Sequence, residues 1–166
     1  MKTLLFALAL ILSFSSVRAQ VIGSGSSQPV ALGRTVLGLG GSIGLTGGIG
    51  VSFRDHFPSV VSYQIVAGII KPDARVSYDA GFELQADIMK GETNRFYICA
   101  ATGYFFNGEG GKNELSAPWR VGVGAGNEWA NFNTSQFHVD LELLITYFND
   151  ETVIPIPQLG VHYYFF

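Results

Sequence analysis

The chain is organised by a strict alternation of apolar and polar residues, in segments that are separated by short polar turns. The clearest segment covers residues 75–88, where every second position from Val76 to Ile88 is apolar and the intervening positions are charged, polar or glycine. Because successive side chains of a β-strand point to opposite faces, this pattern predicts a strand with one apolar and one polar face.

The same reasoning predicts strands over residues 45–54, 59–70, 119–129 and 137–147, a last strand ending at Phe166, and a weaker first strand over residues 34–41. Residues 95–106 also predict a strand, but both sets of alternate positions are apolar, so its facing is ambiguous. The predicted turns cover residues 55–58, 71–73, 90–94, 130–134 and 149–152, with a longer polar loop at 107–118. Single-chain membrane barrels have an even number of antiparallel strands. The expected fold is therefore all-β: a closed, antiparallel, up-and-down transmembrane β-barrel of about eight strands.

Alternation alone does not say which face is inside. In a soluble barrel the apolar positions fill the lumen, whereas in a membrane barrel they face lipid. The apolar positions carry no charge in the clearly alternating strands, as expected where a Lys or Arg at the bilayer midplane costs about 2–4 kcal/mol. Aromatic residues also gather at strand ends, as in the girdles at the two membrane interfaces. One predicted girdle holds Tyr104, Phe106, Trp119 and Tyr147, and the other holds Phe53, Phe96, Trp129, Phe137, Tyr163 and Phe165.

The N-terminus has the pattern of a secretory signal peptide. Lys2 precedes a short apolar run, and small residues lead up to a predicted cleavage site after Ala19. Residues 20–33 are rich in Ser and Gly and are expected to form a flexible lead-in to a barrel domain at 34–166. Removing Lys2 and Arg18 leaves 8 basic residues against 13 acidic ones, and no basic patch points to nucleic acid.

The signal peptide, the eight alternating strands and the aromatic last strand resemble the small bacterial outer-membrane barrels of the OmpA, OmpX and opacity-protein group. The resemblance covers residues 34–166 and implies an outer-membrane location, lipid as the surroundings, and a monomer. It also implies transient partners: the secretion apparatus and the barrel-assembly machinery, which reads an aromatic C-terminal signal. The positions that match this signal are Leu159, Val161, Tyr163 and Phe165, with Phe166 one residue beyond the phase. With periplasmic termini, the loops at 71–73, 107–118 and 149–152 would face outward.

The polar positions of the strands predict a network of charges in the lumen, because charges confined in a narrow barrel must pair. Its expected members are Arg54, Arg75, Asp79, Glu83, Asp87, Arg120, Glu128, His138, Asp140 and Glu142. We expect Arg120 or Arg75 to bond to Glu83 or Glu142. Pro155 and Pro157 would both lack their N–H toward the same neighbouring strand. The last strand should therefore pair with the first only beyond Pro157.

Three functions of different classes fit this sequence. The first, which we favour, is a non-enzymatic barrel with a filled lumen that serves envelope structure or surface interaction through its loops. The second is an outer-membrane lipid-modifying enzyme in which His138, with Asp140 or Glu142, would activate Ser62 or Ser77. The third is a secreted, lipocalin-like carrier. The three His residues and the single Cys show no metal-ligand spacing, and no metal, cofactor or catalytic site is predicted.

Overall fold

The computed structural model describes residues 35–71, 74–91, 93–130 and 136–165. The signal peptide, its cleavage site, the lead-in and Phe166 lie outside the described residues. Among the residues that are described, no helix has the length and apolar character needed to cross a membrane.

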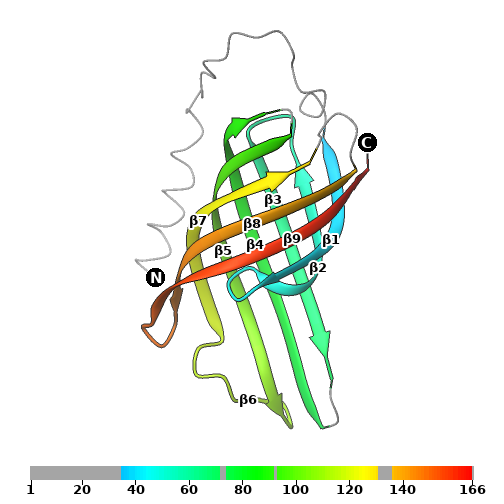
Figure 1. The fold of residues 1–166 in the computed structure, drawn as a ribbon. Helices are drawn as coiled ribbons and strands as arrows, with labels where there is room; N and C mark the ends of the chain where they lie inside the picture. The colour runs from blue at the N-terminus through cyan, green and yellow to red at the C-terminus, as the bar shows by residue number, and fades with distance from the viewer. Residues whose placement is uncertain (1–34, 72–73, 92, 131–135, 166) are drawn as a thin grey trace.

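The described residues form a single antiparallel sheet of nine strands (Figure 1). The strands are β1 (Val36–Gly44), β2 (Gly48–His56), β3 (Val61–Ile70), β4 (Arg75–Lys90), β5 (Asn94–Glu109), β6 (Lys112–Asn113), β7 (Trp119–Trp129), β8 (Phe137–Phe148) and β9 (Val153–Phe165). Sequence neighbours pair around the sheet, and β1 pairs with β9, which closes a ring of eight strands. The ninth, β6, is a two-residue strand that pairs with Gly108 and Glu109 at the C-terminal end of β5. The predicted fold class and strand number are confirmed.

The stagger of the barrel follows from tracing paired residues once around the ring. The path that starts at Gly38 of β1 passes through Arg54, Gln64, Glu83, Ala101, Gly122 and Thr146 to Ile154 of β9. Gly38 itself pairs with Tyr164, ten residues beyond Ile154. With a rise of ~3.3 Å per residue and ~4.8 Å between strands, this stagger tilts the strands by roughly 40°. Such a barrel is only wide enough for side chains to fill.

Two predicted boundaries are wrong. The first hairpin turns at residues 45–47, so that β1 extends to Gly44 and β2 extends to His56. Gly48, with φ of 113°, supplies the conformation that this turn needs, whereas the glycines before it stay extended in register. The predicted loop at 107–118 is also partly a hairpin, because Gly110 and Gly111, with φ of 60° and 83°, form a tight turn between β5 and β6.

The seam between β1 and β9 has the predicted asymmetry. β9 pairs with β8 from Val153 onward, but its pairing with β1 begins at Gln158, directly after Pro157. Residues 153–157 therefore have no strand beside them on the β1 side, where Pro155 and Pro157 offer no N–H. The prediction of a seam that starts beyond Pro157 is confirmed.

The two faces of the barrel are inverted relative to a soluble protein. The outward positions carry the large exposed apolar side chains, among them Ile43, Val123 and Leu143, each more than half exposed. The buried lumen is predominantly polar, with charged residues such as Arg54, Glu128 and Glu142 at 0–2% exposure. One charged residue does not follow this division, because Asp55 of β2 is in phase with the outward Phe53. Its Oδ1 has no hydrogen-bond partner among the described residues.

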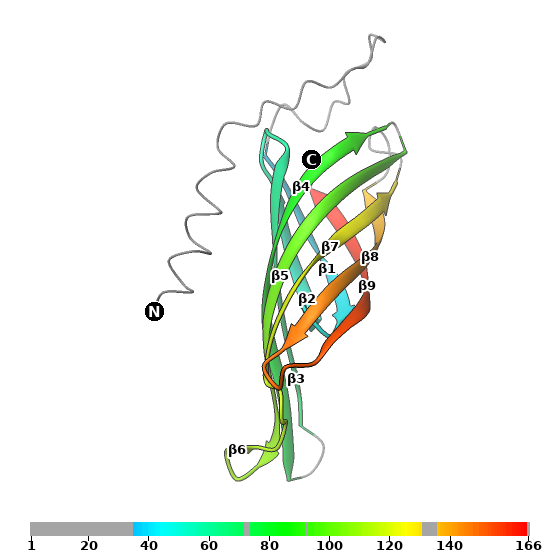
Figure 2. The same cartoon turned by 90° about the vertical axis from the view of Figure 1, so that its left-hand side faces the viewer.

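The strands are unequal in length, and this shapes the end of the barrel that lies away from the C-terminus, which we call the outer end (Figure 1). β4 and β5 continue well beyond the β1–β2 hairpin, on the side away from the C-terminus, and carry β6 (Figures 1 and 2). One side of the barrel is therefore tall and the side formed by β1 and β2 is short.

Candidate functional site

The lumen is organised around Arg54, which projects inward from β2 and is completely buried. Its guanidinium lies 3.0 Å from both Glu128 of β7 and Asp140 of β8, and its Nε donates to Gln64 Oε1 at 2.7 Å. Several charge-assisted hydrogen bonds from one planar group fix its position strongly. Arg54 thus links strands from opposite sides of the barrel.

A second arginine, Arg95 of β5, completes the network toward the end that holds the C-terminus. It lies 2.6 Å from Asp87 and from Glu128, and donates to Gln85 Oε1 at 2.6 Å. Glu128 therefore bridges both arginines and also lies 2.6 Å from His138 Nδ1. Three such partners offset the cost of removing the Glu128 carboxylate from water. Without them, the buried charge would be strongly destabilising.

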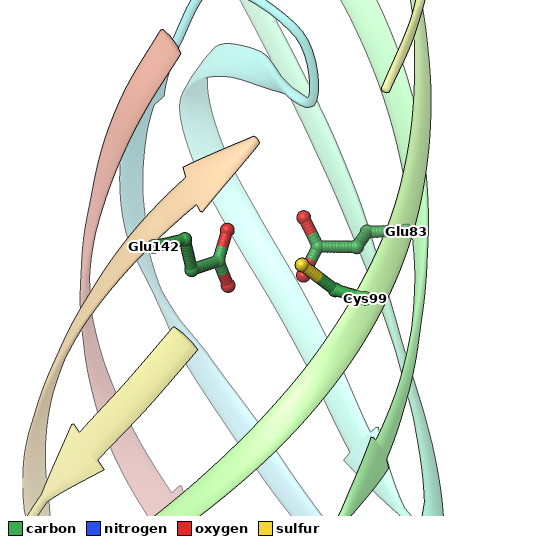
Figure 3. A group of neighbouring side chains, drawn as sticks. All are labelled: Glu83, Cys99 and Glu142. Carbon is green, nitrogen blue, oxygen red and sulfur yellow. The ribbon is translucent and has the colours of Figure 1, made fainter. Parts of the chain in front are cut away.

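Glu83 and Glu142 face one another across the lumen, with the Cys99 thiol beside them (Figure 3). One ligand atom from each of the three residues lies within 4.8 Å of the others, which is close enough to hold a metal ion. Both carboxylates already accept hydrogen bonds, however. Gln158 donates to Glu142 at 2.7 Å and to Glu83 at 3.1 Å. Gln85 donates to Glu83, and Tyr97 to Glu142. An ion here would displace these donors.

The lumen also contains a Ser–His–Asp chain that the sequence analysis did not anticipate. Ser52 Oγ lies 2.8 Å from His162 Nε2, and His162 Nδ1 lies 3.2 Å from Asp140 Oδ2. This order of groups is that of a nucleophile, its base and an orienting carboxylate. Ser52 and His162 are fully buried, so no substrate reaches the serine in this structure. The two serines predicted as partners of His138 make other hydrogen bonds: Ser62 donates to Gln85, and Ser77 donates to Asn107.

The tip of the β1–β2 hairpin folds into the lumen and closes it from the outer side. Thr46 is fully buried and its hydroxyl bonds to that of Thr146 at 2.6 Å. The Gly47 N–H donates to Gln158 Oε1, also at 2.6 Å. Three facing strands make room by carrying glycine: a Cβ on Gly81 would lie 1.9 Å from Gly47 O, and one on Gly103 would lie 2.3 Å from Thr46 O. The third is Gly122, whose added Cβ would lie 2.9 Å from Thr46 Cγ2.

The remaining charged residues of the predicted network lie at or beyond this tip. Arg120 is half-buried and donates to Leu45 O at 2.7 Å, so it holds the hairpin rather than Glu83 or Glu142. Asp79 accepts from the Ile49 N–H at 2.7 Å. Arg75 lies on the protruding part of β4 and pairs with Glu114, with both side chains about half exposed. The predicted bond between Arg120 or Arg75 and Glu83 or Glu142 is therefore wrong.

Of the predicted lumenal residues, the structure brings seven together in one buried network, with Arg54 at its centre: Arg54, Glu83, Asp87, Glu128, His138, Asp140 and Glu142. Sequence reasoning missed Arg95 because residues 95–106 were ambiguous in facing. The signal was present, since Arg95 shares its phase with the small residues Cys99, Ala101 and Gly103. Gln64 and Gln85 also lie on the polar positions of their strands, but the prediction named only charged residues and one histidine as network members.

The predicted girdle aromatics lie on the outward positions of their strands. Near the outer end, Tyr104 contacts Trp119 with ring centroids 4.9 Å apart, and Tyr78 stacks on Phe106 at 4.7 Å. Near the opposite end, Phe137 contacts Tyr163 and Tyr163 contacts Phe165, both at 5.1 Å. The residues of the predicted assembly signal that are described, Leu159, Val161, Tyr163 and Phe165, share this outward phase of β9.

Solved structures of other proteins are similar to this barrel. The N-terminal β-barrel domain of Pseudomonas aeruginosa OprF is similar to the chain with a TM-score of 0.54 and 18% identity, over 80% of this chain and 98% of that one. Two structures of Yersinia pestis Ail, the attachment invasion locus protein, are also similar. The crystal structure gives a TM-score of 0.44 at 16% identity, over 79% of this chain and 96% of that one. The structure in a phospholipid bilayer nanodisc gives 0.43 at 16%, over 80% and 99%.

No family model matches the sequence, and no curated protein is similar to it. The likeness to OprF concerns the fold. The chain therefore has the fold of the small bacterial outer-membrane β-barrels, in agreement with the resemblance found in the sequence.

Proposed function

We propose that this protein is an integral outer-membrane β-barrel without enzymatic activity, whose filled lumen conducts neither ions nor solutes. Its role is envelope structure or surface interaction through the outer loops. The observation that carries the proposal is the combination of an apolar exposed outer face with a charged lumen in which Arg54 and Arg95 are tied to buried carboxylates. Only lipid is a suitable solvent for such an exterior.

The spacing of the aromatic residues supports this location. Trp119 and Trp129 lie at opposite ends of β7, ten residues apart and both outward. Ten residues of a strand tilted by roughly 40° rise about 25 Å along the barrel axis. This matches the height of the apolar band of an outer-membrane barrel, about 25 Å, between its two aromatic girdles.

A closed lumen has a direct electrical consequence. The purified protein reconstituted into planar bilayers should show no steady conductance above that of the bare membrane, because Arg54, Arg95 and the tip at residues 45–47 occupy the lumen. A large, stable and weakly selective conductance in most insertions would overturn the sealed-lumen part of the proposal.

The orientation predicts which turn reaches the cell surface. Gly110 is at the tip of the β5–β6 hairpin, with no atom within 4 Å of the position of an added Cβ. A peptide tag inserted there should bind its antibody on intact cells, whereas a tag in the turn at residues 57–60, at the opposite end, should bind only after permeabilisation. The reverse pattern would contradict periplasmic termini.

The Ser52–His162–Asp140 chain makes a lumenal hydrolase the second candidate. We favour a structural role for it, for two reasons. Ser52 has no exposed surface, and neither hollow described at the outer end is lined by any of the three residues. Asp140 is also bound to Arg54, so the carboxylate serves the ion-pair network as well as the histidine.

A further inference from the structure

The short β1–β2 hairpin leaves a notch in the outer part of the barrel wall. On one side of it, β3 pairs with β2 only as far as Ala67, so residues 68–70 pair with β4 but have no strand beside them on the β2 side. On the other side, residues 153–157 of β9 have no β1 partner. Ile69 pairs with Tyr78, which stacks on the girdle residue Phe106. The notch therefore lies just below and at the outer aromatic girdle, where it faces the hydrocarbon chains of the outer leaflet.

A hollow of about 210 Å³ lies beside the notch, at the outer ends of β3, β4 and β5. Its apolar lining comes from Ile49 at the start of β2, from Ile69 and Ile70 of β3, and from Phe105, Phe106 and Leu115. Ile70 lies at its edge and is 65% exposed. An apolar cavity of ~150 Å³ in a protein holds a molecule the size of benzene, so this hollow admits the end of a hydrocarbon chain.

Several of the polar groups that line the hollow are already bonded to other parts of the protein. Asp79 accepts from the Ile49 N–H, and the Ser77 hydroxyl donates to Asn107 Oδ1. The Asn107 N–H donates to Asn113. An occupant that needs hydrogen bonds would find few of these groups available, and burying it unbonded would be costly. The lining thus favours an occupant without polar atoms.

We propose that this hollow takes up the acyl chain of an outer-leaflet lipid, which enters from the bilayer through the notch between β9 and β3. The inference rests on the proposed membrane location. The prolines at the β9 edge fit an entrance of this kind, because Pro155 and Pro157 leave no N–H there that needs a partner strand. The other outer hollow, of about 260 Å³, has two charged residues in its lining, Arg120 and Asp150, against Asp79 alone in this one, and is less suited to hydrocarbon.

The test is photolabelling in phosphatidylcholine vesicles that contain a small fraction of phosphatidylcholine with a diazirine on its acyl chain. After irradiation, mass spectrometry locates the labelled residues. We expect label on Ile49, Ile70 and Phe105, which line the hollow, as well as on the outward Val123, which does not. Phe148, which lies inward in the other hollow beside Arg120, should remain unlabelled.

A variant separates chain entry from other routes of labelling. Ile70→Asp places a carboxylate at the mouth of the hollow, and should lower labelling of Phe105 by roughly tenfold, since an unpaired charge is costly beside hydrocarbon. The matched control, Thr152→Asp in the other hollow, should leave labelling of Phe105 unchanged. Normal labelling of the outward Val123, which lies outside the hollow, checks in both variants that the barrel is folded and inserted.

Each outcome is informative. If the outward residues are labelled and Ile49, Ile70 and Phe105 are not, the protein is a membrane barrel but the hollow takes up no chain. Labelling of Phe105 that is equal in wild type and Ile70→Asp would also overturn the inference. If even Ile69 and Val123 stay unlabelled, the proposed membrane location itself is wrong.

Discussion

Arg54→Met should destabilise the folded barrel by about 3–5 kcal/mol, the usual cost of leaving a buried ion pair without one partner. Arg54 is fully buried and lies 3.0 Å from both Glu128 and Asp140. Methionine fills similar space but supplies no charge, so Asp140 would lose its arginine partner and Glu128 would keep only Arg95. Urea titration in vesicles, followed by the loss of the heat-modifiable band on gels, measures the change.

Two controls separate the buried pair from charge in general. Arg75→Met removes a cation whose partner, Glu114, is about half exposed, and the expected cost is about 0–1 kcal/mol. Combining Arg54→Met with Asp140→Asn should recover part of the lost stability, because the carboxylate that lost its arginine is then uncharged, whereas Glu128 keeps Arg95. Equal effects of the Arg54 and Arg75 variants would show that the lumenal network contributes little.

Gly81→Val should expel the hairpin tip from the lumen. The new Cβ would lie 1.9 Å from Gly47 O and 2.4 Å from Gly47 C, a distance that only movement of the backbone can relieve. We expect a loss of about 1–3 kcal/mol, as for other overpacked interiors. The direct readout is exposure of the tip. In a Cys99→Ser background, Thr46→Cys should react with a membrane-impermeant maleimide only when Gly81→Val is also present.

The matched control is Gly41→Ala in the same hairpin, because a Cβ there would meet no atom closer than Gly50 O at 3.6 Å. It should leave the Thr46→Cys thiol protected. If Gly81→Val prevents folding, the milder Gly103→Ala provides the same test, since its Cβ would lie 2.3 Å from Thr46 O. A folded Gly81→Val protein with a protected tip would contradict the plug.

Much of this fold could be predicted because lipid imposes a simple rule on the sequence. Outward positions within the hydrocarbon must be apolar, so the phase of β4, β7 and β8 can be recognised strand by strand. The proline pair at 155 and 157 likewise fixed where the seam begins. These features depend on local pattern alone.

The contacts inside the lumen depend on tilt and stagger, which no single strand reveals. Arg54 and Asp140 meet because a stagger of ten residues sets the relative heights of β2 and β8. Arg120 and Arg75 carry the same charge and lie on polar positions, yet their strands place them near or above the hairpin tip. The inward course of the turn at 45–47 could not be predicted for a similar reason. The glycines that make room for it lie on three other strands, β4, β5 and β7.

The inward course of the first hairpin limits how this protein can change during evolution. Surface turns tolerate inserted residues because the extra chain extends into solvent, and the turns at 110–111 and 149–152 have that freedom. Residues added at 45–47 would instead have to fit among Gly81, Gly103 and Gly122. Among homologous chains the length of this turn should therefore stay constant while the other outer turns vary.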